Sequence, residues 1–340
     1  MILPYRTQRA IKRSLAFALI LAVAAAIIWL CWLLWLGRFV VYTRQGGVRL
    51  DFSQSNQSLS GTPAVRPPAK KPVSIHYGDG SEGNKNTALT QLMGYYADAE
   101  ALRSDMGEVL SQVKKLPAGT PVMVDVKSIT GRFFYSSTVG DKRDTVINTA
   151  EMDALIEEMN SRDLYTIARL PALRDYYYGL NHVPDGLPTA GGYLWMDEDN
   201  CYWLNPASQG TITYLTQIVS ELKRLGFDEV VFYDFYFPET QSIVFKGDKQ
   251  QALATAAKTL VTTCAPDTEG FTVSFTGKAD FALPEGRSRL YMENVSAAQC
   301  AAIAQQTGLA DPAIRLVFLA GTHDTRFNDY GVLRPISMAD

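Results

Sequence analysis

The sequence contains few residues of the kinds that most often hold metals. Only three of its 340 residues are histidine, and they lie far apart, at His76, His182 and His323. The chain therefore lacks the closely spaced ligands of an HExxH zinc site. The GxSxG turn of serine hydrolases and the phosphate-binding P-loop are missing too. We therefore predict neither a metal nor a cofactor.

Cysteine is also scarce. Of the four cysteines, Cys31 lies in an apolar run, while Cys201, Cys264 and Cys300 are widely spaced in the rest of the chain. This spacing fits neither a disulfide framework nor a zinc site. We expect these three cysteines to be core residues.

Positive charge is in short supply after residue 50. Residues 51–340 contain 25 Lys or Arg against 35 Asp or Glu, a net charge of −10. Binding to a phosphate backbone needs a basic face, so we predict no nucleic-acid partner. Residues 1–50 show the opposite bias, with seven basic residues and no acidic one.

One uncharged stretch, residues 15–36, is long enough to cross a bilayer. Its 22 residues would span roughly 33 Å as a helix at about 1.5 Å per residue. Basic residues precede it and three tryptophans lie in its last two turns, as expected at the cytoplasmic side and at the opposite membrane interface. We predict a cytoplasmic segment at 1–14, a transmembrane helix at 15–36 and an extracytoplasmic remainder on the cell membrane. A cleaved signal peptide is the alternative, although its apolar core is usually about 7–15 residues.

Residues 37–86 are expected to form a flexible linker. From Ser53 onward this segment is rich in Ser, Gln, Pro, Gly and Lys and has few large apolar residues, so it cannot build a core. It contains a GxGxxG match at Gly78, Gly80 and Gly83, but neither a strand pattern before it nor a helix pattern after it supports a dinucleotide site.

Residues 87–340 are predicted to form one α/β domain, a (β/α)₈ TIM-barrel-like fold. Seven short apolar runs indicate strands, at 92–97, 120–126, 163–170, 229–237, 271–275, 289–293 and 314–321. Segments with helical spacing lie between most of them, at 101–115, 151–160, 207–225, 248–264 and 296–307. This alternation and the length of the domain favour a parallel barrel. The eighth strand is expected near Leu333, and an open doubly wound sheet is the alternative.

Charged or polar residues lie at the ends of these predicted strands. In a parallel barrel these ends form the mouth that carries function. The residues concerned are Asp125, Lys127, Arg169, Asp234, Tyr236, Glu293, His323 and Asp324. Each one alone could be a solvated charge or part of a salt bridge, but together they predict a mouth supplied with carboxylates.

Aromatic residues gather in the segment 176–203, which Gly and Pro interrupt. It includes Tyr176, Tyr177, Tyr178, Tyr193, Trp195, Tyr202 and Trp203. Aromatic faces can stack on sugar rings, and two carboxylates across one mouth suit glycoside hydrolysis. A local hydrophobic minicore is the alternative.

These motifs resemble a bacterial glycoside-hydrolase-like family with a TIM-barrel fold. The resemblance runs from about Leu92 to Pro238. The family shows a D-V-K strand followed by G and an aromatic residue, an I-A-R strand leading to a K/R-D pair, and W-x-D, W-x-(D/N)-P and G-F-D-E segments. The corresponding residues are Asp125-Val126-Lys127 with Gly131 and Phe133, Ile167-Ala168-Arg169 with Arg174-Asp175, Trp195-Met196-Asp197, Trp203-Leu204-Asn205-Pro206 and Gly226-Phe227-Asp228-Glu229.

The next family motif, F-D-Y-x-R-F-P, is altered in this chain, which reads F-Y-D-F-Y-F-P from residue 232 to 238. Tyr233 stands at the aspartate position and Tyr236 at the arginine position. Side chains alternate along a strand, so Asp234 should face the other way unless a bulge or the strand end redirects it.

Together with the predicted membrane anchor, the resemblance implies a glycoside-hydrolase-like protein that acts on an envelope or extracellular polysaccharide. We expect Asp234 to be the nucleophile or base and Glu293 the acid. The expected substrate-binding residues are Asp125, Lys127, Arg169, Asp175, Trp195, Asp197, Trp203 and Tyr236. The alternative is a catalytically inactive barrel that binds glycan or a protein partner at the cell surface.

Overall fold

The computed structural model describes residues 89–339 apart from 141, 267–269 and 279–280, together with Trp29 and two short strands. The chain divides into two compact units, Met1–Pro63 and Ala64–Asp340. In the first, β1 (Val40–Tyr42) pairs antiparallel with β2 (Val48–Leu50). Apart from Trp29, the predicted transmembrane helix at 15–36 lies outside the described residues, as does most of the predicted linker at 37–86. Among the described helices, none has both the length and the hydropathy that a membrane crossing requires.

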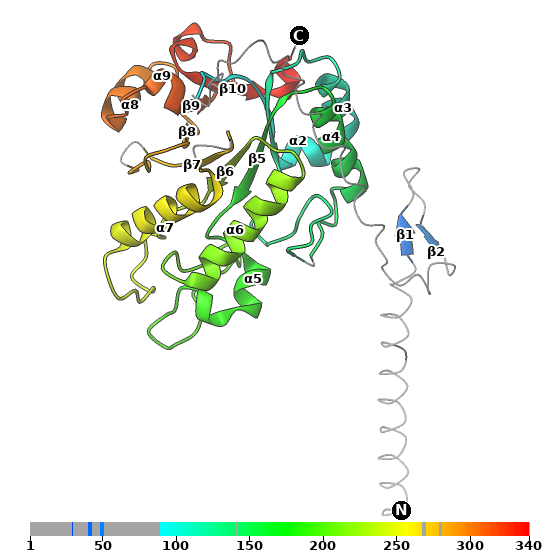
Figure 1. The fold of residues 1–340 in the computed structure, drawn as a ribbon. Helices are drawn as coiled ribbons and strands as arrows, with labels where there is room; N and C mark the ends of the chain where they lie inside the picture. The colour runs from blue at the N-terminus through cyan, green and yellow to red at the C-terminus, as the bar shows by residue number, and fades with distance from the viewer. Residues whose placement is uncertain are drawn as a thin grey trace, which may run out of the picture. The chain divides into compact units, whose positions relative to one another are not determined.

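The second unit is built on a closed barrel of eight parallel strands (Figure 1). The strands are β3 (Met93–Ala97), β4 (Pro121–Asp125), β5 (Tyr165–Pro171), β6 (Glu229–Tyr233), β7 (Thr272–Thr276), β8 (Leu290–Met292), β9 (Leu316–Leu319) and β10 (Gly331–Pro335). They follow one another around the barrel in chain order, and β10 pairs with β3 to close it. The predicted barrel is thus confirmed, and its eighth strand contains Leu333.

Helices connect most of the strands and cover the outside of the barrel. They are α2 (Ala99–Ser104), α3 (Met106–Val113), α4 (Thr149–Ser161), α5 (Tyr176–Asn181), α6 (Gln209–Arg224), α7 (Lys249–Cys264), α8 (Cys300–Thr307) and α9 (Pro312–Arg315). Asp, Asn or Ser side chains cap the first turn of most of them, as Ser208 does for α6 and Asp248 for α7. Figure 1 shows α6 and α7 side by side. The sequence did not predict α5, which lies in the aromatic segment.

Strand alternation places two sets of side chains on opposite faces of the barrel wall. Met123, Ile167, Val231, Tyr291 and Leu333 belong to one buried cluster inside the barrel. The alternate residues of β4, β5 and β6 pack against the helices in a larger cluster, and those of β8, β9 and β10 do so in a second cluster. Cys201, Cys264 and Cys300 are buried free thiols, which confirms their prediction as core residues.

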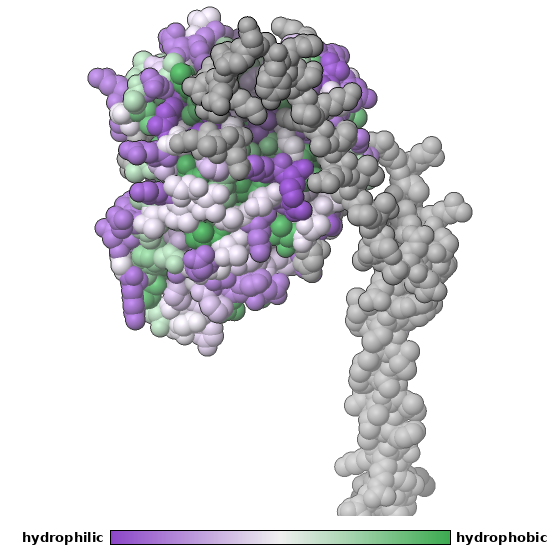
Figure 2. All heavy atoms as spheres, viewed as in Figure 1, coloured by the Kyte–Doolittle hydropathy of each residue, from purple (hydrophilic) through white to green (hydrophobic). Residues whose placement is uncertain are grey.

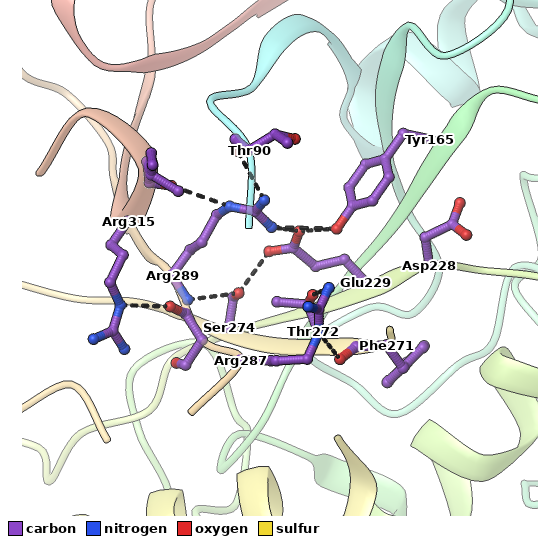
Figure 3. Close-up of polar contacts among 12 residues, drawn as sticks. Thr90, Tyr165, Asp228, Glu229, Phe271, Thr272, Ser274, Arg287, Arg289 and Arg315 are labelled. Atoms are coloured by element: carbon purple, nitrogen blue, oxygen red, sulfur yellow. Dashed lines mark hydrogen bonds and ion pairs between the residues drawn. The ribbon is translucent and has the colours of Figure 1, made fainter. Parts of the chain in front are cut away.

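A buried polar network closes the barrel at the N-terminal ends of its strands (Figure 3). Glu229, at the start of β6, accepts hydrogen bonds from Arg289, Tyr165, Ser274 and Tyr291. Both members of the Arg289–Glu229 ion pair are at most 1% exposed. A buried ion pair of this kind needs such complete partnering to offset its lost hydration. We call this network the closed end.

The outer surface is mixed. On the face that Figure 2 shows, hydrophilic and neutral residues predominate among the described atoms, and hydrophobic residues form small separate groups. Small groups of this kind are normal on a protein surface.

Candidate active site at the barrel mouth

Arg169 organises the C-terminal ends of the strands, which we call the mouth. Arg169 lies in β5. One nitrogen of its guanidinium group donates a hydrogen bond to Asp125 Oδ1 at 2.8 Å, and a second donates to Glu293 Oε1 at 2.7 Å. Asp125 ends β4, and Glu293 directly follows β8. The structure therefore brings together three of the predicted site residues, which come from three different strands.

The members of this ion-pair cluster differ in exposure. The Asp125 side chain is 7% exposed, and its second oxygen accepts a 2.8 Å hydrogen bond from the Ala99 N–H. Burial raises the pKa of Asp125, although Arg169 and the hydrogen bond from the Ala99 N–H act to lower it. Glu293 is 28% exposed. Asp125 therefore holds Arg169 in place, and Glu293 is the carboxylate that a ligand can reach.

A hollow of about 190 Å³ opens beside this cluster. Its lining includes Asp125, Arg169 and Glu293, together with Tyr96, Asp98, Asn294 and Leu319. The sequence analysis did not select Tyr96, Asp98 or Asn294. Asp98 directly follows β3, so the same rule that selected the other strand ends could have identified it.

Tyr233 and Asp234 lie at the end of β6, where the sequence departs from the family motif. The Arg169 guanidinium carbon lies 4.3 Å from the centre of the Tyr233 ring, so the tyrosine packs against the cluster from inside the mouth. Asp234 follows the last residue of the strand with φ of +51°. Aspartate tolerates this left-handed conformation. The strand end, not a bulge within the strand, therefore sets the direction of the Asp234 side chain.

The Asp234 carboxylate is mostly buried. Burial raises the pKa of Asp234, and the charge of Glu293 adds to this effect, while Arg174 and Arg169 oppose it. Asp234 Oδ2 lies 3.9 Å from Arg174 Nη1 and has no hydrogen-bond partner among the described residues. A carboxyl group in this environment retains its proton to higher pH than an ordinary aspartate does.

Arg174 joins the aromatic segment to the mouth, a role that the sequence analysis did not predict. Its guanidinium group donates to Asp197 and Asp199, and Trp203 Nε1 donates to Asp197 Oδ2 at 2.8 Å. Burial alone would raise the pKa of Asp197, but hydrogen bonds from Arg174, the Cys201 N–H and Trp203 lower it. Arg174 and Asp197 thereby hold the segment beside Asp234.

The three aromatic residues that were predicted to bind substrate differ in exposure. Trp203 is only 3% exposed and packs edge-on against Tyr236, with 5.0 Å between ring centres. Tyr236 is 49% exposed, and Trp195 is half-buried. Tyr236 and Trp195 can therefore offer a surface to a sugar, whereas Trp203 supports them from below.

Lys127 and Asp175 lie in the closed interior, away from the hollow. They form a 2.7 Å ion pair in which neither side chain is exposed. Asp175 also accepts hydrogen bonds from the Tyr214 hydroxyl and the Tyr178 N–H. A side chain on Gly131, which has φ of +84°, would collide with Asp175. The structure thus places this pair, with neither side chain exposed, at the start of α5.

Comparison with known proteins places this site in a family. Residues 95–271 match the family described as "Putative glycosyl hydrolase domain". The chain belongs to this family. No curated protein matches it.

Several solved structures resemble the chain. The α-galactosidase AgaA of Geobacillus stearothermophilus aligns with a TM-score of 0.51 and 11% identity, over 76% of this chain and 41% of AgaA. A hypothetical protein of Ruminiclostridium thermocellum aligns with a TM-score of 0.44 and 20% identity, over 54% of this chain and 96% of that protein. The glycoside hydrolase domain of PelA from Pseudomonas aeruginosa aligns with a TM-score of 0.42 and 12% identity, over 68% of this chain and 84% of that domain. This chain thus spans less than half of AgaA, and the likeness to AgaA supports the barrel fold alone.

Proposed function

We propose that this protein is a membrane-anchored glycoside hydrolase that acts on an envelope or extracellular polysaccharide, with Asp234 and Glu293 as its carboxylate pair. The observation that carries the proposal is the contrast between these two groups. The Asp234 side chain is 16% exposed and its partial burial raises its pKa, while Glu293 is 28% exposed and bonded to Arg169. Glycosidases use two carboxyl groups whose environments set different roles.

The environments favour a division of roles opposite to the one expected from the sequence. A general acid must hold its proton near the working pH, and the raised pKa of Asp234 suits that task. Asp234 would then protonate the leaving glycosidic oxygen. Glu293, held by Arg169, would attack the anomeric carbon or activate a water molecule. Asp125 positions Arg169, and Arg174 positions Asp234.

The proposed location comes from the sequence alone. The basic segment 1–14 and the apolar run 15–36 would anchor the chain in the cell membrane. The polar stretch that follows Ser53, if it behaves as a flexible coil, would hold the barrel on the order of 30–35 Å from the bilayer. That reach suits a polymer at the cell surface.

A panel of polysaccharides tests the activity. The full-length protein in detergent is incubated with each polymer, and the release of reducing ends is measured. Asp234→Asn should lower the rate by roughly 10²–10⁴, since the acid is lost. The matched control is Asp329→Asn, which alters an exposed aspartate and should retain the wild-type rate. Full activity of Asp234→Asn would remove Asp234 from the mechanism.

The second candidate is a catalytically inactive barrel that binds glycan or a protein partner. It is favoured by Tyr233, which stands at the family's aspartate position and packs against Arg169. Tight glycan binding by the wild-type protein, with no reducing ends released over long incubation, would support this candidate over the hydrolase.

A further inference from the structure

A second hollow lies next to the one at Glu293. It has a volume of about 210 Å³ and lies between α2, α3 and the chain that follows β10. The two hollows share Tyr96 and Asp98 in their linings. A ligand seated at Glu293 could therefore continue over the end of β3 into the second hollow.

The lining of the second hollow combines polar and apolar groups. Asp98 and Asp105 each use one carboxylate oxygen to cap a helix, through the N–H groups of Ala101 and Glu108. Their second oxygens accept no hydrogen bond from the described residues. Val109 and Ile336 add buried apolar surface. Hydroxyl-rich ligands with apolar ring faces match such a lining.

The exposed Tyr236 ring lies on the other side of the mouth. Going around the barrel from β3, the strand order is β4, β5 and then β6, so the ends of β3 and β6 stand nearly opposite each other in a closed ring of eight. Tyr236 follows β6, is 49% exposed and rests on the buried Trp203. Trp203 is in turn fixed by Asp197. The aromatic surface is therefore held in place before a ligand arrives.

Three buried polar atoms near the mouth also lack partners. Arg169 Nε, Asp234 Oδ2 and Thr276 Oγ1 are buried without a hydrogen bond from the described residues. They belong to the ends of β5, β6 and β7, which are neighbours on the path between the two sides. Buried polar groups are normally satisfied. Four further buried atoms among the described residues also lack a hydrogen bond, so these three atoms support a polar ligand at the mouth only in combination with the hollows.

We infer that the mouth is an open cleft with sugar-binding subsites on both sides of Glu293. The second hollow forms the subsites on one side, and Tyr236 forms those on the other. Such a cleft takes internal stretches of a polymer instead of chain ends. This inference rests on the proposed function for the cutting step, but the subsites can be tested through binding alone.

The charge of the cleft narrows the polymer class. The two hollows are lined by five carboxylates, those of Asp98, Asp105, Glu108, Asp125 and Glu293, against one guanidinium group, that of Arg169. This excess repels a polyanion. The polymer is therefore neutral or amine-bearing.

Binding to oligosaccharides of increasing length tests the cleft. The full-length Glu293→Gln protein, which should not cut, is titrated calorimetrically with neutral chito-oligosaccharides from the disaccharide upward, with their amine-bearing deacetylated forms and with polygalacturonate. Affinity should rise with length in the neutral or the amine-bearing series, and polygalacturonate should not bind. Equal affinity for the disaccharide and the longest oligomers in both series would overturn the cleft, and tight binding of polygalacturonate would overturn the charge argument.

Variants at the two rims separate the subsites. Tyr236→Ala removes the exposed ring, and Ser104→Met fills the second hollow. Each variant should lower the affinity for long oligomers by about 3–10-fold and leave the affinity for the disaccharide unchanged. Tyr236→Phe, which keeps the ring, should restore most of the affinity for long oligomers that Tyr236→Ala loses. Equal losses for short and long oligomers would contradict the two-sided cleft.

The products formed by the wild-type protein test the cutting step separately. Shortening of a polymer into a range of oligomers supports internal cleavage, whereas stepwise release of monomers contradicts it. If no polymer is cut, the proposed function fails, while the length dependence of binding still decides whether the cleft exists.

Discussion

Each end of the barrel carries an arginine–glutamate ion pair, but the two pairs differ in how far they are exposed to solvent. At the closed end, Arg289 and Glu229 are at most 1% exposed, and Tyr165, Ser274 and Tyr291 complete the bonding of Glu229. At the mouth, Arg169 is 14% exposed and Glu293 is 28% exposed. At the closed end the protein's own groups complete the bonding of the ion pair, whereas at the mouth Glu293 stays within reach of a ligand.

This difference shows how one barrel separates stability from activity. Family motifs are found at both ends. The G-F-D-E motif ends in Glu229 and supplies the closed end, while the D-V-K and I-A-R motifs bring Asp125 and Arg169 to the mouth. Buried polar groups without partners are costly, and Arg169 Nε and Asp234 Oδ2 are two such groups at the mouth. The comparison therefore predicts large stability effects at one end and large binding or activity effects at the other.

The largest stability effect is expected from Glu229→Gln. The new amide group would face donors from Arg289, Ser274, Tyr165 and Tyr291, leaving the buried arginine without a carboxylate. The free energy of unfolding, measured with urea, should fall by about 3–5 kcal/mol.

The matched variant at the mouth is Glu293→Gln. Because Glu293 is partly exposed and its ion pair is accessible to water, the free energy of unfolding should fall by only about 0–1 kcal/mol. The comparison of the two ends breaks if the two variants lose similar stability.

Lys127→Met sharpens the comparison, because it tests a buried pair close to the mouth. Asp175 would remain buried, with the Tyr214 hydroxyl and the Tyr178 N–H as the remaining donors to its side chain among the described residues. The loss should lie at the lower end of about 3–5 kcal/mol, with glycan affinity unchanged in the protein that remains folded. A weaker affinity at unchanged stability would return Lys127 to the substrate site.

The smallest effect concerns Asp234 and pH. Burial raises the pKa of Asp234 above its value in the unfolded chain, so the native state binds more protons between these two pKa values. Stability from this group is therefore complete below the unfolded pKa, near 3.9, and falls as pH rises through the folded pKa. In Asp234→Asn this decline should be absent.

Urea unfolding of the wild type and Asp234→Asn at a series of pH values measures this effect. The stability of the variant relative to the wild type should increase with pH and then level off. A relative stability that decreases over this range would show that the carboxylate is stabilised in the native state as an anion.

The sequence predicted the barrel because most of its strands are short apolar runs separated by helical segments. Even β10 was expected near Leu333. Helix α5 was missed because its sequence, Tyr176–Asn181, has a glycine and aromatic residues that suit a loop equally well. Its formation depends on the Asp175 cap, and Lys127 holds Asp175 from a distant part of the chain.

The candidate site was predicted in part. The strand-end rule brought Asp125, Arg169 and Glu293 together correctly, since strand ends of a parallel barrel must meet. It placed Lys127 at the mouth as well, but β4 ends at Asp125 and the chain then turns Lys127 towards Asp175. The link from Arg174 to Asp234 depends on a contact across loops, which sequence spacing does not encode.

The central claim is that the mouth cleaves glycosidic bonds through Glu293 and Asp234. The most direct measurement is the rate of reducing-end release by Glu293→Gln from a polymer that the wild-type protein degrades, beside Glu157→Gln, an exposed glutamate of α4. The account predicts a loss of roughly 10²–10⁴ for Glu293→Gln, with stability retained and Glu157→Gln unchanged. A wild-type rate for Glu293→Gln would contradict it.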